Sequence, residues 1–447
     1  MKRELLVLSV AILLIAACTK SPDNTPPSQQ SNTDPVVTNT PPIIQWQKSF
    51  GGSGDESANA IQQTKDGGYI IAGTSNSNNG DVSGNHGKED FWVLKLNSAG
   101  SIEWQKSYGG SSSDYATSVK QTNDGGYIVS GQTFSKDGDI TNNTSTIGGS
   151  FWVIKLSSAG ALQWQECLAL NTVGCGAADI QQTTEGGYVV VGNANYLMPT
   201  LSYGDVLVIK LGNAGNIEWT KALGGHYHDG AKAIQQTTDG GYIISGNTAS
   251  SDGIFSVNHG SFTYDYYVVK ITTVGDIQWQ KVYGSSGNDD AKSVKQTADG
   301  GYIVAGDIEV NDGDVTGGHG GEEYWILKLD NNGNITWKKC YGGSGNEIAY
   351  AIQQTTDNGY VIAGTSQNST DGDVTVSHGS YDFWIVKTDN PGVIQWQKSY
   401  GGQHDDYARS IIQTVDGGYI VAGQSNSVNG DVTGNHGNSD CWVVKLK

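Results

Sequence analysis

Carboxylate side chains recur at one place in this chain, directly before a short apolar stretch and after a glycine-rich loop such as "GGSGDES" (residues 51–57). Six carboxylates around one opening could bind a cation or a basic partner. They could also accept hydrogen bonds from backbone N–H groups of nearby loops, which is the interpretation that a feature repeated along the chain favours. The acids are Glu56, Asp114, Asp229, Asp289, Glu347 and Asp406, with Cys175 at the third copy.

A second recurrent group combines an aspartate, a histidine and a further acid within one long polar loop. The Gly-Asp residues are Asp81, Asp139, Asp314, Asp373 and Asp431. The histidines are His86, His259, His319, His378 and His436, and the acids after them are Asp90, Asp265, Glu323, Asp382 and Asp440. A histidine that donates to the following acid would hold the loop against the rest of its repeat.

Calcium is the alternative interpretation of the same loops, because this ion takes six to eight oxygen ligands. The stretch "NDGDVTG" (residues 311–317) has part of the aspartate spacing of an EF-hand, but the closing bidentate glutamate is not at the right offset. We therefore predict no cofactor, and calcium is the one ion left open.

A lysine recurs in every copy of an apolar stretch such as "DFWVLKL" (residues 90–96). A buried ammonium group needs a carboxylate or carbonyl partner, so we expect a structural ion pair. The lysines are Lys95, Lys155, Lys210, Lys270, Lys328, Lys387 and Lys445.

No catalytic residues are predicted, because catalysis needs an acid, a base and a nucleophile in different roles, whereas these polar groups repeat. The third copy departs from the others by losing polar residues and gaining apolar ones. Its long loop carries a possible contact patch for a ligand or protein; local repacking that buries these side chains is the alternative. The patch comprises Leu197, Met198, Leu201 and Tyr203.

The cysteines fall into three groups. Cys167 and Cys175 flank the altered loop of the third copy and could form a disulfide in an oxidising compartment. Cys340 and Cys441 occupy ordinary strand positions, where we expect packed thiols. Cys18 lies at the end of an N-terminal apolar run.

The elements that position these groups come from an internal repeat. A Trp series (Trp46 to Trp396) and a Tyr series (Tyr69 to Tyr419) each have seven members, at steps of 54 to 61 residues. Each unit holds four short apolar or alternating stretches, separated by Asp-Gly, Ala-Gly and longer polar loops that are typical of hairpins. Seven units of four antiparallel strands predict an all-β, seven-bladed β-propeller.

The two ends of the repeat region predict how the ring closes. The first globular stretch, "IIQWQKSF" (Ile43 to Phe50), is a Trp-type strand without a preceding partner, and the last, "DCWVVKLK" (Asp440 to Lys447), lacks its Trp-type successor. The N-terminal strand therefore completes the seventh blade, which removes an open sheet edge.

The unit "WQKSYGGSSSDYATSVKQTNDGGYIVSGQT…FWVIKL" resembles the seven-bladed propeller repeat of secreted and surface proteins of bacteria. The resemblance covers Ile43 to Lys447 and implies the fold, but little about activity.

The N-terminus has the features of a secretory signal, with two basic residues followed by an apolar run from Leu5 to Ala17. Ile15-Ala16-Ala17-Cys18 resembles the lipobox of bacterial lipoproteins, which implies cleavage before Cys18 and acylation of that residue. Residues 18–42 contain six of the eight prolines and few apolar side chains, so we expect an extended tether. Residues 43–447 form the propeller.

These features predict a non-enzymatic lipoprotein of the outer membrane and cell surface, whose propeller is an interaction or ligand-binding scaffold. A carbohydrate-binding surface module is the alternative, since 12 Trp and 22 Tyr could stack on sugars, and a polysaccharide-degrading enzyme ranks third. The net charge of −19 argues against nucleic acid and an anionic bilayer surface as partners. Membrane contact is expected through the lipid anchor only, and the sequence does not identify the protein or glycan ligand.

Overall fold

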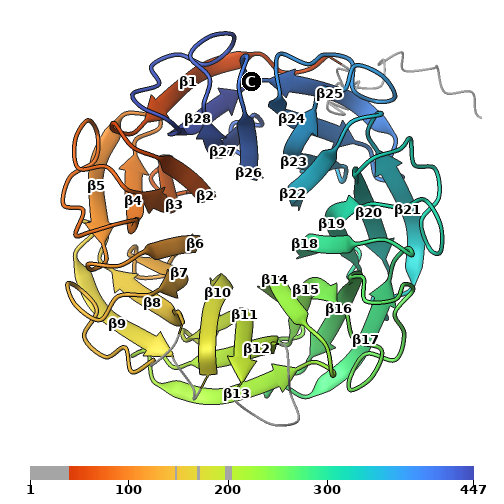
Figure 1. Cartoon of the computed structure of the whole chain (residues 1–447), viewed down its shortest axis with the longest axis horizontal. Coiled ribbons are helices and arrows are strands. Elements are labelled where there is room, and N and C mark those ends of the chain that lie inside the picture. Colours follow the sequence, from red (N-terminus) through yellow and green to blue (C-terminus); the bar gives the residue numbers. More distant parts are fainter. Residues whose placement is uncertain (1–39, 146–147, 169–171, 197–203) are drawn as a thin grey trace, which may run out of the picture. The chain divides into compact units, whose positions relative to one another are not determined.

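The computed structural model describes residues 40–145, 148–168, 172–196 and 204–447. Within these ranges the chain forms 28 β-strands and no helix, so none of the described segments is a helix able to cross a membrane. The strands form seven antiparallel sheets of four strands, placed as blades around a central channel (Figure 1). This confirms the all-β, seven-bladed propeller.

Each blade takes its strands in order from the channel to the rim. Blade 1 holds β2 (Glu56–Gln63), β3 (Tyr69–Ser75), β4 (Asp90–Leu96) and β5 (Ile102–Tyr108). Blade 2 holds β6 (Asp114–Gln121), β7 (Tyr127–Thr133), β8 (Ser150–Leu156) and β9 (Leu162–Leu168). Blade 3 holds β10 (Thr172–Gln182), β11 (Tyr188–Tyr196), β12 (Asp205–Leu211) and β13 (Ile217–Leu223).

The remaining blades repeat the same order. Blade 4 holds β14 (Asp229–Gln236), β15 (Tyr242–Thr248), β16 (Asp265–Ile271) and β17 (Ile277–Tyr283). Blade 5 holds β18 (Asp289–Gln296), β19 (Tyr302–Ile308), β20 (Glu323–Leu329) and β21 (Ile335–Tyr341). Blade 6 holds β22 (Glu347–Gln354), β23 (Tyr360–Gln367), β24 (Tyr381–Thr388) and β25 (Ile394–Tyr400). Blade 7 holds β26 (Asp406–Gln413), β27 (Tyr419–Ser425), β28 (Asp440–Leu446) and, on the rim, β1 (Ile44–Phe50).

Closure of the ring follows the prediction. Strand β1 pairs antiparallel with β28, from Ile44 opposite Leu446 to Phe50 opposite Cys441. Ile43 and Lys447 exchange both backbone hydrogen bonds beyond the strand ends, at 3.1 and 3.0 Å. The first and last strands thus fill one sheet, and that blade has no unpaired edge left by the chain ends.

The apolar runs of the sequence become the middle strands of the blades. All seven residues of β3 and of β4 are buried, because each middle strand has a neighbouring blade on both faces. Most residues of the rim strands are half-buried or exposed, as in β5. The core is therefore a set of layers between successive blades.

Aromatic pairs join each rim strand to the next blade. The rim tryptophan of one blade meets the Gly-Gly-Tyr tyrosine of the following blade edge to face at all seven junctions, with ring centroids 5.7 to 6.2 Å apart. Trp46 of β1 packs on Tyr69 of blade 1 in this way. Both series are therefore junction aromatics, and the rim tryptophans are packed against protein.

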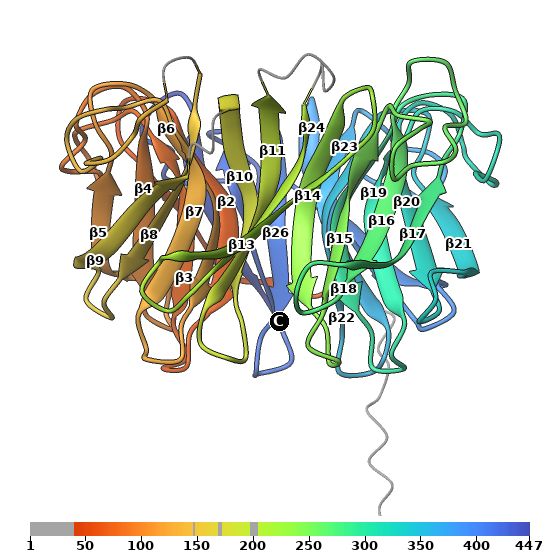
Figure 2. The same ribbon diagram turned by 90° about the horizontal axis from the view of Figure 1, so that it is seen from below.

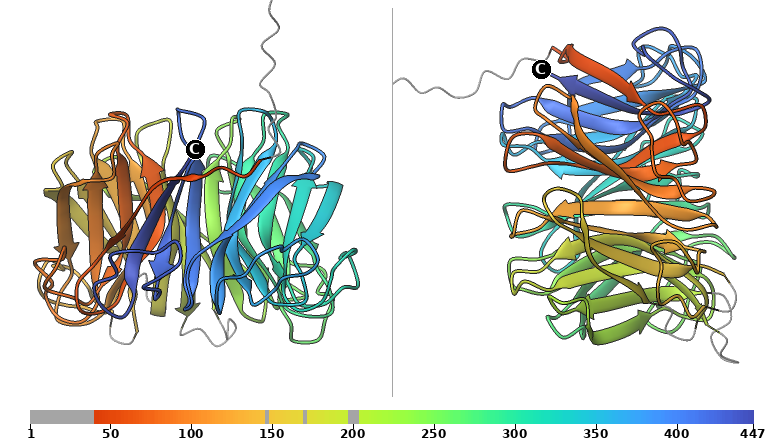
Figure 3. Two further views of the ribbon diagram at one scale, coloured as in Figure 1. Left: turned by 90° about the horizontal axis from the view of Figure 1, so that it is seen from above. Right: turned by 90° about the vertical axis from the view of Figure 1, so that its left-hand side faces the viewer.

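The propeller has two different faces (Figures 2 and 3). The long loops lie on one face, together with the linkers between blades, and the tight turns such as residues 65–68 lie on the other. Ile43 pairs with Lys447 at the turn end of β28. The chain therefore enters the propeller on the turn face, opposite the long loops.

Candidate functional site

The six acids that precede the inner strands are buried rather than arranged around an open mouth. Their exposed fractions are 0 to 1%, and each accepts a hydrogen bond from a backbone N–H of its own linker, such as Gly52 N to Glu56 at 2.7 Å. The equivalent bonds run from linker residues 110, 225, 285, 343 and 402 at 2.6 to 2.9 Å. Burial and the backbone donors support the framework interpretation of Glu56, Asp114, Asp229, Asp289, Glu347 and Asp406, and the cation-binding face stays a prediction.

Each of these acids meets a second buried carboxylate from the preceding blade. The first linker glycine separates them: a Cβ added at Gly51 would lie 2.5 Å from Glu56 Oε2 and 2.6 Å from Asp440 Oδ1. The same arrangement occurs at the pairs Asp90–Asp114, Asp205–Asp229, Asp265–Asp289, Glu323–Glu347 and Asp382–Asp406. At the junction between blades 2 and 3, Ser150 begins β8 and Cys175 is the fourth residue of β10, so both acids are missing together.

Burial, together with repulsion by the facing acid, raises the pKa values of several of these acids. Burial first, then the charge of Asp265, raises the pKa of Asp289 to about 7. Burial, then the charge of Glu323, raises the pKa of Glu347 to about 7, and burial, with a contribution from Asp382, raises that of Asp406 to about 6. The pairs therefore favour a shared proton over two charges near neutral pH.

The expected histidine–acid pairs are present in the long loops. The Nδ1 atoms of His86, His259, His319, His378 and His436 lie 2.7 to 3.6 Å from Asp90, Asp265, Glu323, Asp382 and Asp440. The Nε2 atoms of two of them also reach the Gly-Asp residue of the next blade, His86 to Asp139 at 3.9 Å and His259 to Asp314 at 3.6 Å. These histidines therefore hold their loops in place and connect neighbouring blades.

The Gly-Asp carboxylates face the linker rather than an empty ligand cage. Asp81 and its equivalents Asp139, Asp314, Asp373 and Asp431 accept from linker glycine N–H groups at 3.2 to 3.4 Å. Among the described residues, no group of three or more His, Cys, Asp or Glu side chains is arranged to hold a metal ion. The geometry gives the calcium interpretation no support in these loops.

The recurrent lysine has the partner that its burial requires. In six blades its Nζ lies 2.8 to 3.1 Å from the aspartate of the Asp-Gly-Gly or Asp-Asn-Gly turn. Glu185 occupies that turn in blade 3, and Lys210 pairs with Glu218 at 3.1 Å instead. The lysines are thus structural, as the sequence indicated.

The disulfide considered between Cys167 and Cys175 is not formed, and both residues are thiols. Cys167 packs against the core between blades 1 and 2, whereas Cys175 belongs to the core between blades 2 and 3. The two side chains therefore lie on opposite faces of blade 2. The apolar patch considered at Leu197, Met198, Leu201 and Tyr203 lies outside the described residues.

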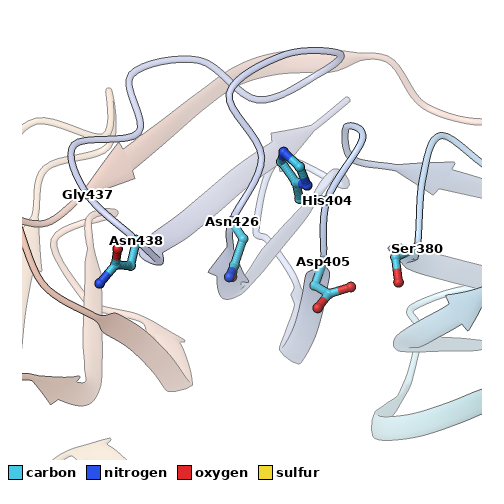
Figure 4. A pocket seen from close by; sticks show the side chains of 6 residues that line it. All are labelled: Ser380, His404, Asp405, Asn426, Gly437 and Asn438. Atoms are coloured by element: carbon cyan, nitrogen blue, oxygen red, sulfur yellow. The ribbon is translucent and has the colours of Figure 1, made fainter.

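A polar pocket of about 590 Å³ lies on the long-loop face, between blades 6, 7 and 1 (Figure 4). Its lining residues are Ser380, His404, Asp405, Asn426, Gly437 and Asn438. They come from loops, and the pocket has no apolar side chain that could anchor a ligand.

The central channel is the larger cavity, with a volume of about 940 Å³, and the inner strands of all seven blades line it. The fourth residue of the regular inner strands follows an alanine at a β-bulge, for example Asn59 between Ala58 and Ala60. A bulge turns one side chain away from the regular pleat. All seven bulged residues line the channel: Asn59, Thr117, Ala178, Lys232, Lys292, Tyr350 and Arg409.

This channel position was not predicted from the sequence. The alanine before it is the same in all seven copies, and so is the glutamine that ends each strand, but the fourth residue differs in almost every copy. Variation at this position, which the second residue of the inner strand shares, was the available signal. Such variation lets each blade present a different side chain to a ligand that lacks sevenfold symmetry.

No protein-family model matches the sequence, and no curated protein matches it. Among solved structures, the chain is similar to the WD40 β-propeller domain of Doa1, at 10% identity over 90% of this chain and 96% of that chain, with a TM-score of 0.49. The WD40 domain of Pan2 from Neurospora crassa matches at 11% identity over 89% and 95% of the two chains, with a TM-score of 0.49. A puromycin hydrolase mutant complexed with PGG matches at 14% identity over 87% of this chain and 52% of that chain, with a TM-score of 0.43. Likeness at this level concerns the fold alone.

Proposed function

We propose that this protein is a non-enzymatic binding protein, anchored outside the cytoplasm through an acylated Cys18, whose propeller presents a ligand site at its central channel. The observation that carries the proposal is the contrast within the inner strands. Positions that hold the blades together are repeated, whereas the bulged position that faces the channel varies from Asn59 to Arg409.

The position of the chain entry agrees with this arrangement. Ile43 lies on the turn face, so a tether that begins at Cys18 joins the propeller on the side opposite the long loops. The chain entry therefore leaves the long-loop end of the channel uncovered.

An enzymatic role is not favoured by the carboxylates. Glycoside hydrolysis needs two accessible carboxyl groups in different environments. The paired acids here are buried at six junctions and accept hydrogen bonds from their linkers, so they are part of the framework. The junction tryptophans pack against protein and are not available to stack on sugars. A carbohydrate would therefore have to bind in the channel.

Two measurements test the proposal. Labelling with an alkyne-tagged fatty acid during expression in a bacterial host should modify the full chain and should fail for Cys18→Ser, which should also leave the membrane fraction. A panel of glycans and extracytoplasmic proteins should yield a bound species that is recovered chemically unchanged. Acylation that persists in Cys18→Ser contradicts the anchor, and conversion of the bound species contradicts the non-enzymatic assignment.

A further inference from the structure

The channel wall is basic although the protein is acidic. The ionisable residues that line it are Lys120, Asp179, Lys232, Lys292, Lys295 and Arg409. Five cations face one carboxylate there, whereas the whole chain has a net charge of −19. Positive charge concentrated in a narrow opening with low-dielectric walls attracts anions more strongly than the same charges on a flat surface.

Carboxylate side chains already neutralise some of these cations, so fewer of them are available to bind an anion. Lys292 lies 2.8 Å from both Asp290 and Asp307, and Lys232 lies 3.1 Å from Asp290. Lys120 lies 3.7 Å from Asp179 at another part of the wall. The lysines near Asp290 therefore form a charged network rather than free anion-binding groups.

Arg409 differs from these lysines. Its guanidinium carbon lies 4.2 Å from the ring centre of Tyr350 and 5.4 Å from that of Tyr407, so the group stacks on aromatic rings. No carboxylate or carbonyl of the described residues binds it, although it is the one arginine in residues 40–447. A stacked guanidinium keeps its N–H donors in the plane of the group and available to a bidentate acceptor.

The surroundings of Arg409 extend the aromatic surface toward the long-loop face. Tyr381, at the start of β24, packs against Tyr407 with ring centroids 5.0 Å apart. Tyr350 also has the Lys292 ammonium 5.7 Å from its ring centre. Tyr350, Tyr381, Tyr407 and Arg409, called the arginine–tyrosine cluster below, are all partly exposed.

We infer that the arginine–tyrosine cluster binds the carboxylate of an acidic oligosaccharide that enters the channel from the long-loop face. This inference rests on the proposed binding function and names its ligand class. The guanidinium supplies a paired contact for a planar carboxylate, and the tyrosines supply ring faces and hydroxyl groups for the sugar.

The rest of the wall favours a sugar over an acidic peptide. Between the charged groups the channel carries amides and hydroxyls. Asn59, Thr117 and Gln62 each use one polar atom to bind a neighbouring inner strand, and the remaining amide atoms of Asn59 and Gln62 face the channel as partners for saccharide hydroxyl groups. Most isoleucines of the wall, such as Ile234 and Ile352, are almost fully buried, and Ile412 is half-buried.

The test uses the full chain in a non-ionic detergent and fluorescent trigalacturonate as the probe. Trigalacturonate should bind, the neutral trisaccharide of galactose should not, and raising the salt from 50 to 500 mM should weaken binding several-fold. Arg409→Gln should weaken binding at least tenfold. Lys106→Gln is the matched control, because Lys106 is exposed on the rim strand β5 and its loss removes the same charge.

A second Arg409 variant and a peptide probe distinguish an acidic oligosaccharide from an acidic peptide as the ligand. Arg409→Lys keeps the positive charge but loses the bidentate donors of the guanidinium group, so this variant should also lose most of the affinity. If Arg409→Gln does not fold, Arg409→Lys replaces it, and thermal unfolding checks that this variant is folded. No binding of trigalacturonate, or binding unchanged in both Arg409 variants, overturns the inference. Tighter, Arg409-dependent binding of hexaglutamate overturns the sugar assignment in favour of an acidic peptide. If a different glycan or protein binds in the panel described under the proposed function, the binding function stands even when the inference about acidic oligosaccharides fails.

Discussion

At the scale of single residues, most of the polar side chains that recur along this chain stabilise the propeller framework. The turn aspartates illustrate this role. Burial acts to raise the pKa of Asp299, but the hydrogen bonds from Lys328, Thr297 and Gly301, together with the charge of Lys328, outweigh it and lower the pKa to about 2. The ion pair matters more for Lys328 than for Asp299. The lysine side chain is 5% exposed and has little contact with water, whereas that of Asp299 is 60% exposed.

Replacing Asp299 tests this asymmetry. Asp299→Asn removes the one carboxylate that neutralises Lys328, so we expect the free energy of unfolding to fall by about 1–2 kcal/mol in denaturant titrations. Glu185→Gln is the control, because Glu185 occupies the same turn in blade 3 while Lys210 pairs with Glu218. It should change stability by less than about 0.5 kcal/mol. Equal effects of the two substitutions would contradict the ion-pair argument.

At the scale of elements, each blade is locked to the next through its outermost turn. In blades 1 to 6 the turn before the rim strand ends in a glycine with positive φ, and this glycine lies under a tryptophan of the preceding blade. A Cβ added at Gly333 (φ +79°) would lie 2.8 Å from the ring of Trp279. The hydroxyl of Tyr283, from the same strand as Trp279, donates to the Gly333 carbonyl at 2.5 Å. The turn and the rim strand of two blades therefore form one joint.

Substitutions at two glycines of blade 5 distinguish the contribution of the tryptophan contact from the cost of placing a side chain at positive φ. Gly300→Ala introduces a side chain at φ +81° with nothing within 4 Å, so it should cost about 1–2 kcal/mol from conformation alone. Gly333→Ala adds a steric clash with Trp279, and we expect an additional loss of about 1–3 kcal/mol. Chemical denaturation of both variants measures the difference. A Gly333→Ala variant as stable as Gly300→Ala would show that the tryptophan contact carries no weight.

At the scale of the whole molecule, two sets of carboxylates titrate in opposite directions. Junction acids such as Asp289 and Glu347 have pKa values raised to about 7, so the native state binds more protons than the unfolded state between pH 4 and 7. Their contribution to stability is complete below about pH 4 and is lost as the pH rises through 7. The turn aspartates have lowered pKa values, about 2 for Asp66 and Asp416, so their contribution is lost as the pH falls below 4.

The sum predicts that the propeller is most stable in mildly acidic solution, at about pH 4–5. Thermal unfolding at low protein concentration, recorded from pH 3 to 9, should show this maximum. Asp289→Asn should flatten the decline between pH 5 and 8, because one group with a raised pKa no longer titrates. Stability that increases steadily from pH 4 to 9 would contradict the prediction.

Much of the architecture could be predicted from the residues. The apolar stretch at residues 90–96 coincides with β4, because turn residues bound it and an apolar run requires burial on both faces. The closure through β1 followed from counting strand types at the two ends. The histidine–acid and lysine pairs were also predictable, because buried polar groups require partners.

The sequence by itself determined the repeat, the strand order and the identity of the polar groups, since these depend on patterns along the chain. Only the tertiary structure decided which residues meet. It places Glu56 beside Asp440 where the ring closes, puts Cys167 and Cys175 in different interblade cores, and brings Arg409 over Tyr350 of the neighbouring inner strand. Contacts between blades depend on the bulge and register of strands that lie 50 or more residues apart, and no local pattern records that geometry.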